Sequence, residues 1–196
     1  MVPHAIETHY NGYRFRSRLE ARWAVFFDSL GVRYEYEREG FTLPTAPYLP
    51  DFFLPLVRNG LWCEIKPSPC EEPDRAEALM RELTALTQKD GVVLYGDPVD
   101  VMNGLEDSTP NQSWIKFADG GSDGPFYFCL CPWCGKIGFE FDGRGARVCG
   151  FKAHHASGDE ALAAITHLGH WHEDKCYTGN HHRIVTAATT ARSARF

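Results

Sequence analysis

Two aromatic-rich runs flank Asn59-Gly60, and this stretch restricts the possible fold more than any other part of the chain. Asn-Gly between apolar residues is a strong signal for a tight β-hairpin turn. A two-residue turn there pairs Leu54 with Ile65 and Pro55 with Glu64. Side chains alternate between the two faces of a strand. The residues predicted to share the core face are Phe52, Leu54, Leu56, Cys63 and Ile65.

The opposite face of the predicted hairpin carries Asp51, Glu64 and Lys66, two carboxylates and an ammonium group. They form the pattern Pro-Asp, twelve intervening residues, then Glu-x-Lys. Mg²⁺ prefers hard oxygen ligands such as carboxylates, and a bound metal polarises a phosphate and lowers the pKa of its water. A solvated strand face with one ion pair would contain the same residue types. The simple register places Asp51 opposite Ser68, so a shared ion also requires a bend or a bulge.

This pattern resembles that of the PD-(D/E)xK nuclease superfamily. The resemblance implies that Asp51 and Glu64 bind Mg²⁺ or Mn²⁺, with the Ile65 carbonyl as a further ligand, and that Lys66 assists the attacking water. In many members a first helix carries a glutamate that faces the metal, and here that role falls on Glu20. The implied activity is endonucleolytic hydrolysis of DNA, leaving 5′-phosphate and 3′-hydroxyl ends.

The residues before the predicted hairpin at Asn59-Gly60 predict another hairpin and a helix. Asn11-Gly12 lies between aromatic residues, Ser17 and Glu20 have the spacing of a capping box, and Gly31 ends the helical pattern. Glu20 is therefore either a capping residue or the catalytic glutamate implied by the resemblance. The apolar stripe of this helix consists of Leu19, Trp23, Phe26 and Leu30.

Arginines surround Glu20, which is the only acid between Tyr13 and Trp23. Arginine forms forked hydrogen bonds to phosphate oxygens, so these side chains are candidates for nucleic-acid binding. They could equally form a solvated face of the helix. The arginines are Arg14, Arg16, Arg18 and Arg22.

The remaining elements of the first half complete an α/β pattern. Residues 32–39 alternate and predict a strand, Pro73-Asp74 begins a helix that ends at Asp90-Gly91, and residues 92–95 predict a buried strand. A strand, a helix and a strand at this spacing predict a parallel crossover. The resulting αβββαβ order resembles the restriction-endonuclease-like core with a mixed sheet, over residues 8–97. The helix residues expected to face inward are Ala76, Leu79, Met80, Leu83 and Leu86.

A Cys-x-x-Cys-Gly sequence at Cys131 and Cys134 predicts a structural zinc site, since two such thiolates can bind one ion. Cys149 follows after fourteen residues, a spacing that suits a zinc ribbon. A redox pair is the competing interpretation, but no thioredoxin-like crossover surrounds it. We expect His154 as the fourth ligand. Its alternatives are His155 and Cys176, and Cys129 could replace one member of the set.

The sequence predicts three regions. A nuclease-like domain occupies residues 1–100, an acidic, Gly-rich linker residues 101–124, and a ββα-type zinc module with a C-terminal helix residues 125–196. We expect the zinc module to assist substrate binding. Residues 114–117 could add an edge strand, and the basic helix at the C-terminus could contact nucleic acid or simply be solvated.

Composition limits the partners and the location. The net charge of −6 argues against a generally basic surface, so nucleic acid must bind to local patches. We find no transmembrane or signal-peptide pattern, and seven cysteines, an odd number, fit a reducing, cytoplasmic compartment. Two alternatives stay open: a non-cleaving zinc-containing nucleic-acid-binding protein on this scaffold, and a strand cutter of the junction-resolvase or transposase type, which requires a homodimer.

Overall fold

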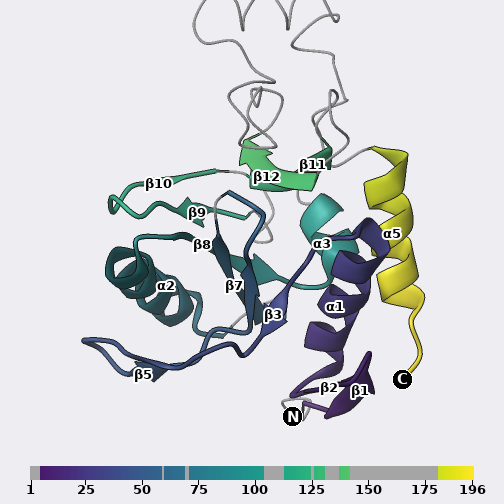
Figure 1. Cartoon of the computed structure of the whole chain (residues 1–196), viewed down its shortest axis with the longest axis horizontal. Coiled ribbons are helices and arrows are strands. Elements are labelled where there is room, and N and C mark those ends of the chain that lie inside the picture. Colours follow the sequence, from purple (N-terminus) through teal and green to yellow (C-terminus); the bar gives the residue numbers. More distant parts are fainter. Residues whose placement is uncertain are drawn as a thin grey trace, which may run out of the picture.

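The computed structural model describes residues 5–58, 60–68, 71–103, 113–124, 126–130, 137–141 and 181–196. These residues form a mixed α/β fold around a mixed sheet with the strand order β10-β9-β8-β7-β6-β3. Helix α2 covers one face of the sheet, and α1, with α5 beside it, covers the other (Figure 1). The sheet is therefore buried on both faces.

The N-terminal hairpin and helix form as predicted. Strands β1 (Thr8–Tyr10) and β2 (Tyr13–Phe15) are joined by a two-residue turn in which Asn11 and Gly12 have φ of 47° and 82°. Helix α1 (Arg18–Leu30) follows directly. Ser17 caps it by accepting a hydrogen bond of 3.2 Å from the backbone N–H of Glu20, and Gly31 ends it at φ 69°. The predicted apolar stripe of α1 packs against the sheet.

The strand predicted over residues 32–39 is much shorter in the structure. Only β3 (Glu35–Tyr36) is extended, and Glu37 ends it with a left-handed φ of 44°. The backbone N–H of Glu37 then donates to the carbonyl of Asp51 at 2.9 Å. A small antiparallel pair follows, formed by β4 (Phe41–Thr42) and β5 (Pro47–Tyr48).

The hairpin predicted to carry Asp51, Glu64 and Lys66 forms, but its predicted register is wrong. Strands β6 (Phe52–Leu54) and β7 (Leu61–Lys66) are antiparallel neighbours. Leu54 pairs with Leu61, whereas the sequence predicted pairing with Ile65, so the register is shifted from residue 65 to residue 61. The predicted pairing of Pro55 with Glu64 fails for the same reason.

Proline chemistry explains the shift. Strand β6 ends before Pro55, which has no N–H to donate to a sheet. The chain then turns around Val57, which is 2% exposed; its N–H donates to the Leu54 carbonyl at 3.4 Å, and Gly60 N–H donates to the Val57 carbonyl at 2.8 Å. Leu56, expected on the core face, lies in this turn and is 76% exposed. The other predicted core residues of the hairpin are buried.

The predicted parallel crossover is present. Helix α2 (Pro73–Thr87) connects β7 to β8 (Asp90–Tyr95), which pairs with β7 in parallel. Its predicted inward residues are buried except Leu86, which is 58% exposed. Two predictions are therefore corrected in detail: Leu86 does not face the core, and the strand begins at Asp90.

Residues 101–124, predicted as a linker, contain ordered elements. Helix α3 (Pro98–Asn103) follows β8, and β9 (Ile115–Lys116) pairs antiparallel with β8. Strand β10 (Ser122–Asp123) pairs with β9 at the edge of the sheet. Residues 114–117 thus contribute a strand, as expected, but β10 and not β9 lies at the edge of the sheet.

The C-terminal elements pack on the same core as α1. Strands β11 (Phe126–Leu130) and β12 (Ile137–Phe141) form an antiparallel hairpin, and α5 (His182–Ser193) lies along α1. The rings of Trp23 and Phe128 are 6.0 Å apart. The zinc module was predicted to begin at position 125, but described residues on both sides of that position belong to one hydrophobic core. The division into domains stays a prediction.

The predicted zinc ligands lie outside the described residues. They are Cys131, Cys134, Cys149 and His154, with the alternatives His155 and Cys176. Cys129, another alternative, is described: it lies on β11 and is buried. Within the described part of the chain, the helices are too short or too polar to cross a membrane.

Candidate active site

The observed register brings Asp51 next to Glu64. Phe52 pairs with Cys63, and continuing the ladder by one residue places Asp51 opposite Glu64 instead of Ser68. The Asp51 carboxylate also accepts a hydrogen bond of 2.7 Å at Oδ2 from the backbone N–H of Ile65. The predicted register had separated Asp51 from Glu64, and the observed register brings these two predicted metal ligands together.

The Ile65 backbone faces this carboxylate. In a strand, the N–H and C=O of one residue point toward the same neighbour, and the next residue points to the other side. The Lys66 carbonyl accepts a hydrogen bond of 2.8 Å from Gly96 N–H, on the β8 side. Because the N–H of Ile65 points to Asp51, its carbonyl points to that side too. This orientation is compatible with the predicted role of the Ile65 carbonyl as a metal ligand.

Glu64 is a buried carboxylate with a partner at each oxygen. Tyr48, on β5, donates its hydroxyl hydrogen to Oε2 at 2.9 Å, and Lys66 Nζ contacts Oε1. The Glu64 residue is 6% exposed, whereas the Lys66 side chain is 34% exposed. Lys66 therefore connects the buried carboxylate to solvent. Sequence analysis did not identify Tyr48, because the pairing of β4 with β5 that carries it has no periodic pattern.

Glu20 receives three hydrogen bonds at its carboxylate. Ser17 Oγ donates to Oε1 at 2.7 Å, while the Tyr36 hydroxyl and the Arg16 backbone N–H donate to Oε2 at 2.6 and 3.1 Å. This is only half of the predicted capping box: Ser17 accepts from Glu20 N–H as expected, but Glu20 binds the N–H of Arg16 instead of that of Ser17. Glu20 thus has a structural role at the helix start while lying near Asp51.

Only one of the four candidate nucleic-acid-binding arginines touches a candidate catalytic carboxylate. Arg16 Nη2 lies 3.1 Å from Asp51 Oδ1, and its Nε lies 2.5 Å from Glu37 Oε1. Arg14 instead pairs with Glu7 at 2.9 Å, with both side chains exposed. The other two differ: Arg18 is exposed, and Arg22 lies 3.9 Å from Asp97.

Burial dominates the electrostatics of the site. It raises the pKa of Asp51 well above the usual range, and the charges of Glu64 and Glu20 raise it further. The hydrogen bond from Ile65 N–H and the charge of Lys66 lower it by less. Burial, together with the adjacent Glu64 charge, also raises the pKa of Tyr48. Negative charge on the Asp51 carboxylate is therefore unfavourable, because the site is buried and two other carboxylates lie nearby.

The chemistry of these donors fits a hard divalent cation. Asp51 and Glu64 present carboxylate oxygens from adjacent positions, and their mutual repulsion would be relieved by a cation. In the geometry of the structure, Arg16 and Lys66 supply this positive charge. Within the described residues, no three His, Cys, Asp or Glu side chains are close enough to hold one metal ion. A cation bound at Asp51 Oδ1 or Glu64 Oε1 would compete with the ion pairs that Arg16 and Lys66 make there.

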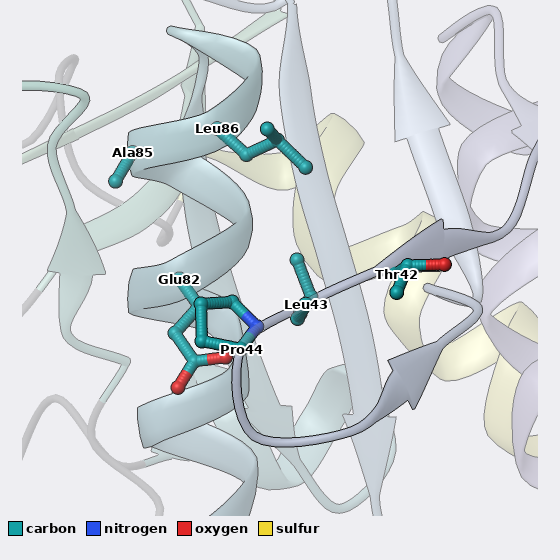
Figure 2. Close-up of a pocket in the computed structure, with 6 residues that line it drawn as sticks. All are labelled: Thr42, Leu43, Pro44, Glu82, Ala85 and Leu86. Carbon is teal, nitrogen blue, oxygen red and sulfur yellow. The ribbon is translucent and has the colours of Figure 1, made fainter.

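A cavity lies elsewhere, between α2 and the turn that joins β4 to β5 (Figure 2). Its volume is about 590 Å³, and Glu82 at its edge accepts a hydrogen bond of 3.0 Å from Thr45 N–H. The candidate catalytic residues do not line it, so it is separate from the site described above. The residues that line it are Thr42, Leu43, Pro44, Glu82, Ala85 and Leu86.

Three residues of the site were not predicted, namely Tyr36, Glu37 and Tyr48. Each contacts a partner far away in the sequence, such as Tyr36 with Glu20 and Tyr48 with Glu64. Their aromatic and acidic character gave no local signal of these contacts. No family model, curated protein or solved structure matches the chain.

Proposed function

We propose that the protein is a divalent-metal-dependent endonuclease that hydrolyses phosphodiester bonds of DNA. The observation that carries the proposal is the register of β6 and β7, which sets Asp51 beside Glu64. Lys66 follows Glu64 by two residues on β7. Two buried carboxylates side by side are costly unless positive charge compensates them, and a divalent ion would compensate both at once. The resemblance to the PD-(D/E)xK pattern gives this geometry its chemical interpretation.

The residues have separate roles in the proposed reaction. Asp51 and Glu64 would hold Mg²⁺ or Mn²⁺, together with the Ile65 carbonyl. The bound ion supplies Lewis-acid polarisation of the phosphate and a water of lowered pKa. Lys66 orients the attacking water, and Glu20 assists at the metal or the water. Water adds to phosphorus and loses a proton, the bond from phosphorus to the 3′ oxygen breaks, and that oxygen takes up a proton, which leaves 5′-phosphate and 3′-hydroxyl ends.

Contacts around the carboxylates support preorganisation of this site. Asp51 is held by the Ile65 N–H, and Glu64 by Tyr48, so neither side chain can rotate freely. Hydrogen bonds that orient metal-binding carboxylates typically matter about 10- to 100-fold for affinity or activity. The partly exposed Lys66 side chain and the exposed Arg16 side chain leave one side of this group accessible to a phosphate.

A second candidate function is nucleic-acid binding without cleavage. The ion pairs of Arg16 with Asp51 and of Lys66 with Glu64 favour it, because they already neutralise the carboxylates. A retired nuclease scaffold could use them for stability alone. The two functions differ in one property: a nuclease must bind a divalent ion at Asp51 and Glu64, and the binding protein need not.

The predicted zinc module is part of the same proposal. We propose that Cys131, Cys134, Cys149 and His154 bind a structural zinc ion and that this region helps to grip the substrate. Arg14, Arg18 and Arg22 stay candidates for contacts with backbone phosphates. A homodimer would be needed only for a cutter of the resolvase type, which acts on branched DNA.

The proposed function is tested with labelled duplex, single-stranded and branched DNA and with RNA, each incubated with Mg²⁺, Mn²⁺ or EDTA. We expect cleavage of at least one DNA substrate with Mg²⁺ or Mn²⁺ and none with EDTA. A Lys66→Ala protein should bind DNA but cleave about 10²- to 10⁴-fold more slowly. Binding without cleavage by the wild-type protein under every condition would favour the second candidate.

A further inference from the structure

The Arg16 side chain links the surface to the buried carboxylate of Asp51. Its side chain is 54% exposed, whereas that of Asp51 is 5% exposed. One arm of the guanidinium group, Nη2, lies 3.1 Å from Asp51 Oδ1. The Nε side lies 2.5 Å from Glu37 Oε1. The guanidinium group therefore contacts two carboxylates at once: it donates a hydrogen bond to the buried Asp51 and forms an ion pair, without hydrogen-bond geometry, with Glu37 at the rim of the site.

The backbone around Arg16 is fixed independently of its side chain. Its N–H lies 3.1 Å from both Glu20 Oε2 and the Tyr36 hydroxyl oxygen. Glu37, the rim partner, has a left-handed φ of 44°, which is unfavourable for a residue with a Cβ atom, and its N–H donates to the Asp51 carbonyl. Both ends of the Arg16–Glu37 pair are thus anchored to the candidate site.

Phosphodiester oxygens compete for the same donors as a carboxylate. A guanidinium group presents a rigid fork of N–H donors that suits both anions, and its Nη arm can change partner while Nε keeps its own. The exposure of Arg16 makes this exchange possible without unfolding. A divalent ion and the Arg16 arm, in turn, compete for the same oxygen of Asp51.

We propose that Arg16 guards Asp51 and responds to phosphate: it neutralises Asp51 in the free protein and transfers its Nη arm to a phosphodiester oxygen of bound nucleic acid. Glu37 keeps the Nε side and so acts as a positioning residue for the arm. This inference rests on the proposed metal-dependent function, and it assigns Arg16 a regulatory contact that Arg14, paired with Glu7 outside the site, does not make.

This role of Arg16 differs from a simple phosphate contact in its effect on the affinity for divalent metal. Removal of Arg16 frees Asp51 and so strengthens metal binding in the absence of nucleic acid, while it weakens nucleic-acid binding. A residue that only contacts DNA would change the affinity for nucleic acid and leave the affinity for metal unchanged. A residue that only stabilises the fold would change the melting temperature and, through it, both affinities in the same direction.

The test measures two affinities for the wild type, Arg16→Ala, Arg16→Gln and Arg33→Ala. Arg33 is a matched control, because it is exposed and pairs with Glu35 at 4.0 Å outside the site. Calorimetric titration without nucleic acid gives the Mn²⁺ affinity. Fluorescence anisotropy in Ca²⁺ gives the affinity for a short DNA duplex. Thermal melting of all four proteins shows which variants are folded.

We expect both Arg16 variants to bind Mn²⁺ at least about threefold more tightly than the wild type, since partly exposed ion pairs have effects of this size. We expect them to bind the duplex about fivefold or more weakly, the lower range of coupling between linked sites. Arg33→Ala should match the wild type in both. Folded Arg16 variants with unchanged or weaker Mn²⁺ binding would overturn the guard even if the wild type cleaves DNA. If the Arg16 variants show both opposite shifts but the wild type does not cleave DNA, only the proposed nuclease function is overturned.

Discussion

The carboxylate of Asp51 accepts a hydrogen bond of 2.7 Å from the backbone N–H of Ile65, the residue that lies between Glu64 and Lys66 on β7. This contact joins the start of β6 to the strand that carries the other candidate catalytic residues. Asp51 is only 4% exposed, so its carboxylate is fixed by the main chain in surroundings of low polarity. A carboxylate in this position is oriented but poorly solvated.

The first prediction follows from the raised pKa of Asp51, caused by burial and by Glu64 and Glu20. The folded state then holds the Asp51 proton more tightly than the unfolded state, so the stability contribution of Asp51 falls as the pH rises above the unfolded pKa of about 3.9. Asp51→Asn cannot ionise. We expect its melting temperature, relative to the wild type, to increase between about pH 4 and pH 8.

Thermal melting across this pH range checks the effect in EDTA. Glu71→Gln provides the matched acid-to-amide control, because Glu71 is exposed; its melting temperature should follow the wild type at every pH. A difference between Asp51→Asn and the wild type that stays constant from pH 4 to pH 8 would show that Asp51 carries no unfavourable buried charge.

The second prediction separates the two roles of Glu20. Its carboxylate accepts from Ser17, Arg16 N–H and Tyr36. A glutamine has only one acceptor oxygen, so Glu20→Gln should lower the free energy of unfolding by about 1–3 kcal/mol, the usual penalty for a lost buried hydrogen bond. If Glu20 also assists catalysis, cleavage well below the melting temperature should fall about 10²-fold or more.

Tyr36→Phe serves as the comparison for Glu20. It removes one of the three donors but keeps the carboxylate, so it should destabilise the protein while cleavage at low temperature stays close to the wild-type rate. Chemical denaturation and initial cleavage rates check both variants. A Glu20→Gln protein with wild-type cleavage would leave Glu20 as a helix-start residue only.

The third prediction concerns Tyr48, whose hydroxyl donates to Glu64 Oε2 at 2.9 Å in a buried position. Tyr48→Phe leaves this oxygen without its donor, so we expect about 1–3 kcal/mol lower stability and about 10- to 100-fold weaker Mn²⁺ binding. Tyr95→Phe is a matched variant, since Tyr95 is buried and donates to Glu77 at 3.2 Å. Calorimetry should show wild-type Mn²⁺ affinity for Tyr95→Phe; equal losses for both variants would remove the specific role of Tyr48.

Local signals in the sequence predicted the elements that depend on a few neighbouring residues. Asn11-Gly12 forms the expected two-residue turn because both residues adopt positive φ there. Helix α1 begins after Ser17 and ends at Gly31, the two positions whose chemistry satisfies the free backbone groups of a helix. The parallel crossover through α2 followed from its length and apolar period.

The register of the β6–β7 hairpin could not be predicted in the same way. Positive φ occurs at Arg58 and Gly60, but β6 ends before Pro55 and the turn is longer than two residues. Burial of Val57 stabilises this longer turn, and that packing involves residues distant in the sequence. The tyrosine and arginine partners of the carboxylates depend on the same tertiary arrangement, so only the carboxylates and Lys66 were visible as a sequence pattern.

The fourth prediction concerns zinc. We expect one zinc ion per chain, bound by Cys131, Cys134, Cys149 and His154, all of which lie outside the described residues. Three thiolates and an imidazole fill a tetrahedral shell, so the ion should be structural. Elemental analysis should find zinc in the wild type and in Cys70→Ser but not in Cys134→Ser. Zinc retained by Cys134→Ser, or absent from the wild type, contradicts the site.

The most direct test of the central claim is the rate of DNA cleavage by the wild type, Asp51→Asn and Glu64→Gln with Mg²⁺ or Mn²⁺, on the substrate that the wild type cleaves best. Glu82→Gln is the matched control, because its carboxylate binds Thr45 beside the separate cavity. We expect cleavage by the wild type and by Glu82→Gln, and at least about a 10²-fold loss in Asp51→Asn and Glu64→Gln, which remove metal-binding charge. Equal cleavage rates for folded wild type, Asp51→Asn and Glu64→Gln would contradict the central claim.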